Sequence, residues 1–256
     1  MRFIVLFVSL FIGVVVSAQP EAQKAFSEGV KLLQTNKYAE AEQKFSLALE
    51  KGEIAKGKKM AYVYKGMALN GQQRYDEAIG CFTKAIEIDS TDAATYTDRG
   101  LTYSYKDDYT NAAADFAKVL TIDSTGKQAE AAYFYIGKIK CLQKNYTEAI
   151  HYLDQLLKLV PTDAEGYYLR GISKGGLLDS KGAIADYTQA IKYQPGYMEA
   201  YANRGVEKVN IIPAELKIIR GKKNCFPDAC ADLKKAKSLG DTTVEDMLFL
   251  YCNDCK

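Results

Sequence analysis

Four of the six cysteines lie close to the C-terminal end, where their thiols could bind a metal ion, form a redox pair or oxidise to disulfides: Cys225, Cys230, Cys252 and Cys255. Cys230 and Cys252 each lie eleven residues from Asp241, in a predicted turn, and the outer two each lie fifteen residues from Gly240. An antiparallel helical hairpin would bring each pair to the same height. The spacing therefore favours two cross-helix disulfides, Cys230–Cys252 and Cys225–Cys255, with a metal site or free thiols as alternatives.

A second string with chemical potential is GxSxG at residues 171–175, the pattern of a nucleophile elbow in which Ser173 would attack an acyl group. Such an elbow needs a strand–turn–helix corner and a histidine partner. The local pattern is helical, and His151 is the only histidine. We find no phosphate-binding glycine loop and no HExxH motif. The chain is therefore predicted not to be an enzyme and to need no metal or cofactor.

Composition narrows the class of partner. The 256 residues are 48% hydrophobic, which suits a sizeable buried core and argues against a disordered chain. The 34 Lys and Arg nearly balance the 32 Asp and Glu, for a formal net charge of +2. A nucleic-acid-binding protein would need a basic face to neutralise phosphates, so we expect no nucleic-acid partner.

The N-terminal segment has the layout of a secretory signal. Arg2 precedes an apolar run at residues 3–16, and small residues at Ser17 and Ala18 offer a cleavage site. The run is shorter than the roughly 20 residues of a membrane-spanning helix, although an uncleaved anchor is the alternative. We expect residues 1–18 to be removed, with cleavage after Ala18. The remaining chain has no further membrane span and is predicted to be periplasmic or secreted.

A repeat covers most of the remaining chain. Its glycines are separated by 37, 34, 37, 34 and 34 residues, at Gly29, Gly66, Gly100, Gly137, Gly171 and Gly205. An alanine follows each of the first five glycines by twelve residues, and a bulky apolar residue comes four residues later. A tyrosine precedes the glycine by four residues in the second to sixth repeats. These spacings predict pairs of amphipathic helices joined by tight turns.

This period and slot pattern resembles the tetratricopeptide repeat family, as in the segment YTDRGLTYSYKDDYTNAAADFAKVLTID at residues 96–123. The resemblance covers about residues 22 to 210, and the C-terminal sequence ACADLKKAKSLGD is similar to those that close secreted bacterial members. It implies an all-α fold, a right-handed superhelical solenoid of about six helix pairs. Its repeats would start near residues 22, 59, 93, 130, 164 and 198.

The sixth repeat is interrupted. After Gly205 the expected alanine is delayed to Ala229 by an insertion that contains proline and glycine. The second helix of the pair then resumes, and a last helix is predicted over residues 242–252. We therefore divide the chain after the signal into a repeat solenoid at 19–212 and a capping region at 213–256. The capping region holds the interrupted repeat and a Cys-rich hairpin.

Charged residues recur beside the repeat landmarks. An arginine stands just before three of the repeat glycines, and an aspartate stands just before the bulky residue of the second helix in the same repeats. The first repeat reverses the signs. We interpret these as structural ion pairs between the two helices of a repeat: Arg99 with Asp115, Arg170 with Asp186, Arg204 with Asp232, and Glu28 with Lys44.

The family resemblance also implies a concave groove lined by the first helix of each repeat. The residues of this chain in the inward slots are Phe26, Val30, Leu33, Met60, Val63, Met67, Asn70, Thr97, Leu101, Phe134, Lys138, Tyr168 and Ile172. They are mainly apolar, which fits an apolar peptide or helix better than an acidic peptide C-terminus. We expect Phe26, Met67, Phe134 and Tyr168 to be the anchors.

The predicted function is a non-catalytic scaffold that binds another protein or peptide outside the cytoplasm. One alternative is a structural assembly factor of an envelope complex that uses the convex face of the solenoid. A further alternative is binding or hydrolysis of a cell-wall fragment, for which no residue argues. The identity of the partner and the oligomeric state are not predicted.

Overall fold

The computed structural model describes residues 21–52, 57–212, 218–219, 222–223 and 226–252. The predicted signal, Cys225 and Cys255 lie outside these ranges. The described helices are residues 21–34, α2 (Tyr38–Glu50), α3 (Lys58–Gly71), α4 (Tyr75–Ile88), α5 (Ala93–Tyr105), α6 (Tyr109–Ile122), α7 (Lys127–Leu142), α8 (Tyr146–Leu159), α9 (Ala164–Gly176), α10 (Ser180–Tyr193), α11 (Met198–Asn210), α13 (Pro227–Ser238) and α14 (Glu245–Tyr251).

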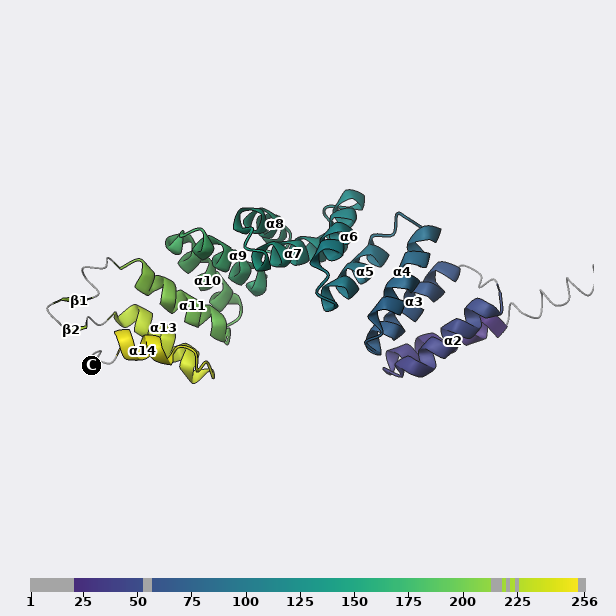
Figure 1. Cartoon of the computed structure of the whole chain (residues 1–256), viewed down its shortest axis with the longest axis horizontal. Coiled ribbons are helices and arrows are strands. Elements are labelled where there is room, and N and C mark those ends of the chain that lie inside the picture. The colour runs from purple at the N-terminus through teal and green to yellow at the C-terminus, as the bar shows by residue number, and fades with distance from the viewer. Residues whose placement is uncertain (1–20, 53–56, 213–217, 220–221, 224–225, 253–256) are drawn as a thin grey trace, which may run out of the picture. The chain divides into compact units, whose positions relative to one another are not determined.

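The helices form two compact units, one ending at Ala132 and the other beginning at Tyr133. In the first unit α2 packs on α3, α3 on α4, α4 on α5 and α5 on α6 (Figure 1). In the second unit the same succession runs from α8 through α11, then to α13 and α14. The expected all-α fold of consecutive helix pairs is confirmed. In the described ranges, no helix has the length and apolar run that crossing a bilayer requires.

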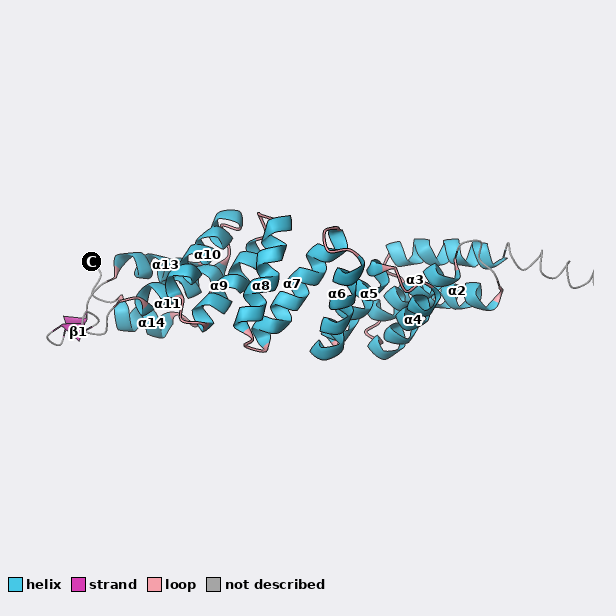
Figure 2. Cartoon of the chain, turned by 90° about the horizontal axis from the view of Figure 1, so that it is seen from above, coloured by secondary structure: helices cyan, strands magenta, loops and turns pink. Residues whose placement is uncertain are grey.

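The strands of the described chain are two residues long. β1 (Ile218–Ile219) and β2 (Lys222–Lys223) pair in antiparallel fashion, with Ile218 opposite Lys223 (Figure 2). They lie within the insertion that interrupts the sixth repeat. Because they pair only with each other, this hairpin does not alter the succession of helix pairs.

The repeat glycines allow the two helices of a pair to approach closely. Phe82 is fully buried, and a Cβ added at Gly66 would lie 2.8 Å from its ring. At Gly171 the added Cβ would lie 2.6 Å from the ring of Tyr187. Such contacts are shorter than van der Waals packing permits, so the bulky residue of the second helix can lie on the first helix only where the side chain is a hydrogen.

The turn inside each pair has a recurring left-handed residue. Non-glycine residues with positive φ stand at this slot in five repeats, at Asn36, Gln73, Asp107, Lys144 and Leu178. The left-handed region is unfavourable for side chains with a Cβ, and asparagine and aspartate tolerate it best. The turn therefore stores backbone strain that depends on the residue type, with a leucine as the least suited occupant.

The last helix is shorter than the predicted 242–252, since α14 begins at Glu245. Asp241 Oδ1 accepts hydrogen bonds from the backbone N–H of Thr243 at 2.8 Å and from its hydroxyl at 2.6 Å. Hydrogen bonds between a side chain and the backbone two residues later stabilise a turn and compete with helix formation. The chain therefore turns at Asp241 before the helix starts.

Candidate functional site

In the first unit, three of the predicted groove residues meet in one pocket. Met67 and Asn70 come from α3 and Leu101 from α5, the first helices of consecutive repeats. The pocket has a volume of about 440 Å³, and it is also lined by Gly71, Gln73, Tyr75, Phe82, Asp98 and Tyr105. We refer to it as the α3–α5 pocket.

Two predicted groove residues of this unit do not reach the surface. Val63 is only 5% exposed, because it packs into the cluster formed with Leu69 and Phe82. Thr97 is 6% exposed, and its hydroxyl donates to the Ala93 carbonyl at 2.9 Å. Because both side chains are buried, they have almost no surface that a ligand could contact. Met60 is half-buried on the same helix as Val63.

The groove residues of the first helix, residues 21–34, are partly buried. Phe26 contacts the rings of Phe45 and Tyr64, with centroids 5.8 and 5.7 Å away. Val30 and Leu33 pack against the same core cluster. These side chains therefore pack partly against the core of the first repeat and leave part of their surface exposed.

In the second unit, Phe134, Tyr168 and Ile172 are partly buried against one core cluster. The ring of Tyr168 lies 4.7 Å from that of Tyr197, and its hydroxyl oxygen accepts from Asn203 Nδ2 at 3.2 Å. Burial raises the pKa of the Tyr168 hydroxyl, as expected for a phenol that is partly removed from water.

Lys138 completes this group. Its Nζ lies 3.3 Å from Glu165 and 5.5 Å from the centroid of the Phe134 ring. A cation held by a carboxylate and an aromatic face adds a polar edge to an otherwise apolar and aromatic surface. The structure thus brings the four predicted residues of this unit into one region.

The α3–α5 pocket also contains Asp98, which the repeat pattern does not predict as a site residue. Desolvation raises the pKa of its carboxyl to about 6, and the charge of Asp92 adds to the rise. The sequence does contain one sign of its difference, at the slot two residues before the repeat glycine, where Asp98 stands. The same slot in the other repeats holds Ser27, Tyr64, Tyr135, Leu169 and Asn203, so Asp98 is its sole acid.

The predicted ion pairs form contacts between helices. Arg99 lies 2.8 Å from Asp115, Arg170 2.6 Å from Asp186, and Arg204 2.6 Å from Asp232. Each arginine donates through both Nε and Nη2, in a bidentate arrangement that fixes its orientation. Lys44 lies 2.6 Å from Glu28 in the first repeat, where both side chains are more exposed. Each contact joins the two helices of one repeat, as predicted from the sequence.

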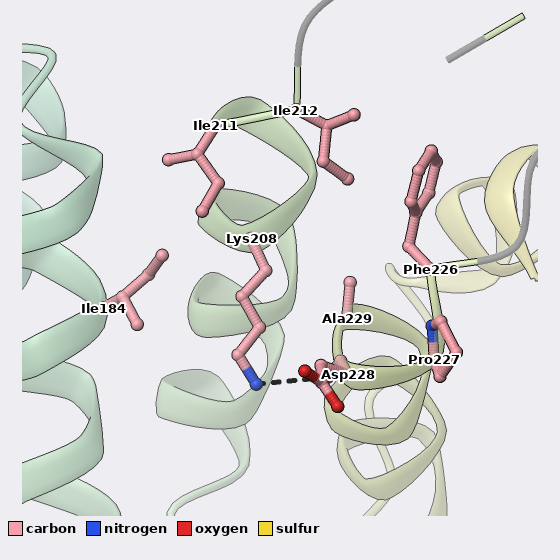
Figure 3. A pocket seen from close by; sticks show the side chains of 8 residues that line it. All are labelled: Ile184, Lys208, Ile211, Ile212, Phe226, Pro227, Asp228 and Ala229. Atoms are coloured by element: carbon pink, nitrogen blue, oxygen red, sulfur yellow. Dashed lines mark hydrogen bonds between the residues drawn. The ribbon is translucent and has the colours of Figure 1, made fainter. Parts of the chain in front are cut away.

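An apolar pocket of about 420 Å³ lies in the second unit, between α10, α11 and α13 (Figure 3). Ile184 lines it from α10, and Ile211 and Ile212 line it from the end of α11. Phe226 lines it from the start of α13. Lys208 crosses its edge, where Nζ donates to the Asp228 carbonyl at 3.1 Å. The pocket involves the second helices of two repeats, unlike the α3–α5 pocket.

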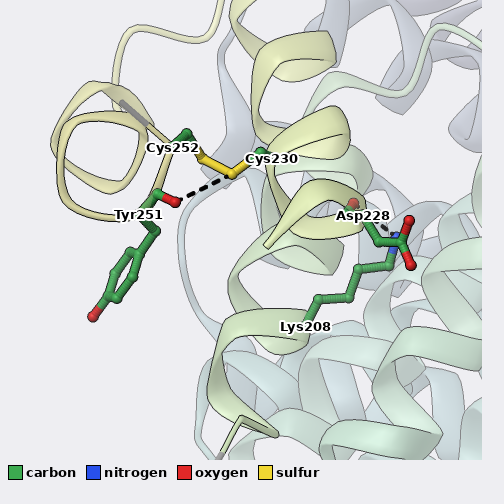
Figure 4. Close-up of a disulfide and its surroundings, with 5 residues drawn as sticks. All are labelled: Lys208, Asp228, Cys230, Tyr251 and Cys252. Carbon is green, nitrogen blue, oxygen red and sulfur yellow. Dashed lines mark hydrogen bonds between the residues drawn. A yellow bond between two sulfur atoms is a disulfide. The ribbon is translucent and has the colours of Figure 1, made fainter. Parts of the chain in front are cut away.

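Of the predicted disulfides, Cys230–Cys252 is present, with a Cα–Cα distance of 5.6 Å (Figure 4). It joins α13 to the end of α14. The second predicted pair, Cys225–Cys255, lies outside the described residues. Cys81 and Cys141 are free thiols, and burial raises the pKa of both, which suits packing residues better than reactive ones.

Ser173 lies inside α9 and is fully buried. Its hydroxyl donates to the Leu169 carbonyl at 2.9 Å, one helical turn earlier. The strand–turn–helix corner of a nucleophile elbow is therefore not formed there. Over the described ranges, no cluster of three or more His, Cys, Asp or Glu side chains has the arrangement of a metal site.

Comparison with protein-family models finds three matches to the tetratricopeptide repeat, at residues 60–92, 93–125 and 131–163. Each match spans one of the helix pairs described above. No curated protein matches the sequence at a significant level.

Solved structures with the same fold share little sequence with the chain. The C-terminal part of a TPR repeat-containing protein from Cytophaga hutchinsonii superposes with a TM-score of 0.71 at 18% identity, covering 94% of this chain and 93% of that one. A tetratricopeptide repeat protein from Parabacteroides merdae gives 0.65 at 16% identity, covering 90% and 98%. YrrB, described as a TPR protein with an unusual peptide-binding site, gives 0.62 at 21% identity, covering 78% and 94%.

Proposed function

Because the chain is an all-α solenoid of the tetratricopeptide repeat family, we propose that it is a non-catalytic protein-interaction scaffold. The first helices of its repeats bind an apolar peptide or helix of another protein. YrrB, which has the same fold, is itself described as having a peptide-binding site. The single observation that carries the proposal is the α3–α5 pocket, where first helices of consecutive repeats leave a space lined by Met67 and Leu101.

The chemistry of these surfaces fits an apolar ligand. Met67 and Leu101 are half-buried, so each has apolar surface to bury against a partner. In the second unit, Phe134 and Tyr168 present aromatic surface beside Ile172. Aromatic and aliphatic side chains of this kind supply most of the affinity in peptide recognition by helical grooves.

The proposal is tested with substitutions that place a charge on these surfaces. The chain without its signal-like segment would be used to capture partners from the cell envelope, beside Met67→Lys and Tyr168→Glu variants and an Ile88→Lys control. Ile88 is half exposed at the end of α4, outside the α3–α5 pocket. Loss of the same captured protein with both groove variants, and its retention by the control, supports the proposal. Retention by all three variants contradicts it.

We propose further that the protein functions outside the cytoplasm. The signal-like segment at residues 1–18 and the Cys230–Cys252 disulfide support this location, because disulfides persist in oxidising compartments. Cell fractionation with N-terminal sequencing tests it. The expected result is an envelope or secreted protein that begins at Gln19, whereas an intact N-terminus in the cytoplasm contradicts it.

A second candidate function is assembly of an envelope complex through the second helices. The apolar pocket beside Ile184 and Ile212 favours it, since a partner could bury these side chains there. An Ile212→Glu variant separates the two functions in the same capture experiment. Loss of the partner with this variant, together with its retention by Met67→Lys, supports the second candidate.

A further inference from the structure

The α3–α5 pocket contains a carboxylate without a partner. Asp98 is half-buried on α5, and no described side chain forms a hydrogen bond or ion pair with its carboxylate. The charge that acts on its pKa comes from Asp92, another acid, and no lysine or arginine contributes. Arg74, next to the Gln73–Tyr75 wall of the pocket, is held by Glu42 and Glu77, each at 2.6 Å. Among the residues that the structure describes, none supplies a cation for Asp98.

A second acceptor in the pocket also lacks a donor. Asn70 Nδ2 donates to the Thr102 hydroxyl at 2.7 Å, and this hydroxyl donates to the Asp98 carbonyl at 2.7 Å. This chain of donors fixes the orientation of the Asn70 amide. Asn70 Oδ1 is left buried with no hydrogen-bond partner, which is unusual in native proteins.

The rest of the lining is apolar or aromatic. Met67 and Leu101 supply aliphatic surface, and the rings of Tyr75 and Tyr105 lie together with centroids 5.9 Å apart. Such walls suit the methylene stem of a long side chain, and tyrosine faces attract a cation. Polar acceptors at one place and apolar walls around them match a side chain with a long stem and a charged donor at its tip.

We propose that the α3–α5 pocket binds the cationic side chain of a lysine or arginine in the partner peptide, with Asp98 as its counter-ion. The inference rests on the proposed function and specifies the chemistry of its ligand. An ionised carboxylate that is partly desolvated and unpaired destabilises the folded chain. An incoming lysine or arginine offsets that cost, whereas an acidic side chain would be repelled.

The test is selection from a random seven-residue peptide library displayed on phage. The baits are the mature chain, an Asp98→Asn variant of nearly the same shape, and an Asp246→Asn control on exposed α14. We expect lysine or arginine to be enriched at one position by the mature chain and by the control, but not by Asp98→Asn. By fluorescence anisotropy, a selected peptide should bind Asp98→Asn about 10- to 100-fold more weakly.

The outcomes separate this inference from the function on which it rests. If the mature chain selects apolar peptides without a basic residue, and Asp98→Asn binds them equally well, the pocket still binds peptides but the lysine or arginine preference is wrong. Enrichment of acidic residues also overturns it. If no bait selects any peptide, the peptide-binding function itself fails, and this inference fails with it.

Discussion

Arg170 connects Asp154, sixteen residues earlier in the chain, to Asp186, sixteen residues later. Its Nη1 lies 2.6 Å from Asp154, while Nε and Nη2 hold Asp186 at 2.9 and 2.6 Å. Asp154 belongs to α8 and Asp186 to α10, so one guanidinium links the second helices of two consecutive repeats. The contacts of Arg170 therefore fix how consecutive repeats stack as well as how the two helices of one repeat meet.

This ion pair can be tested by charge reversal. Asp186 is 3% exposed, so Asp186→Lys should lower the free energy of unfolding by about 3–5 kcal/mol, since it removes the carboxylate shared by Arg170 and Lys174 and places a third cation beside them. Adding Arg170→Glu should restore only part of the loss. The new glutamate would face Asp154, and the new lysine would face Lys174, which bridges to Asp186 at 2.8 Å. Urea unfolding of the single and double variants measures the coupling.

Arg99 and Asp115 provide the matched comparison. Arg99 also reaches back sixteen residues, but its second acceptor is the Thr83 hydroxyl at 2.9 Å, which carries no charge. Double reversal at this pair should therefore restore more of the lost stability than at Arg170 and Asp186. Equal recovery at the two sites would contradict the role assigned to Asp154. A coupling free energy of zero at both sites would show that the ion pairs do not stabilise the fold.

The sequence predicted the pairs within a repeat because both partners stand at fixed distances from the repeat glycine and the bulky residue. It did not predict the second acceptors, Thr83 and Asp154, because these depend on how neighbouring repeats stack. For the same reason the pattern placed Val63 in the groove. Its slot faces inward, but whether a side chain there is covered depends on Phe82 and its neighbours.

The α3–α5 pocket shows a second limit. Periodicity identified Met67, Asn70 and Leu101, since it reports which face of a helix a residue occupies. Periodicity did not identify Asp98, because this residue does not belong to the predicted groove slots. The raised pKa of its carboxyl comes from burial by the surrounding side chains. Single departures from a repeat pattern are thus informative about sites, but their significance is visible only once the neighbouring helices are in place.

The turn residue Leu178 should be a source of instability. It has a φ of 64° and is 90% exposed, so it has the strain of a left-handed residue and little packing to offset it. Leu178→Gly should raise the free energy of unfolding by about 1 kcal/mol. Asn36→Gly is the control, because asparagine tolerates φ of 58° and its Oδ1 accepts from the Tyr38 hydroxyl. Thermal unfolding should show a gain for the first variant and none for the second.

The disulfide should stabilise the C-terminal hairpin. Cys230 and Cys252 are separated by 22 residues, for which the chain-entropy model gives about 3 kcal/mol. A Cys230→Ser/Cys252→Ser double variant should lose about that much stability, and hydrogen exchange should show α14 opening first, since none of its residues is fully buried. A Cys81→Ala variant, which removes a thiol outside the disulfide, is the control. Reaction of Cys230 and Cys252 as thiols in unreduced, secreted protein would contradict the bond.

Asp98 should make stability fall as pH rises. The pKa of its carboxyl is about 6 in the folded chain against an ordinary value of 3.8, so the folded state binds the proton more tightly between these values. Protonation of Asp98 therefore stabilises the folded chain near pH 4, and this stabilisation is lost as pH rises through 6. Comparing urea unfolding of the parent chain and Asp98→Asn from pH 4 to 7 isolates the effect. The variant should gain relative stability as pH rises.

The pKa of the Asp123 carboxyl shifts in the opposite direction to that of Asp98, so Asp123 is the control. Hydrogen bonds from the backbone N–H groups of Thr125 and Gly126 lower the pKa of its carboxyl. A lowered pKa means that the folded state favours the ionised form, so this contribution is lost as pH falls. Asp123→Asn should thus lose stability most clearly at neutral pH, where Asp98→Asn gains it. If the two variants respond to pH with the same sign, Asp98 is not the desolvated, unpaired acid on which the proposed lysine or arginine site depends.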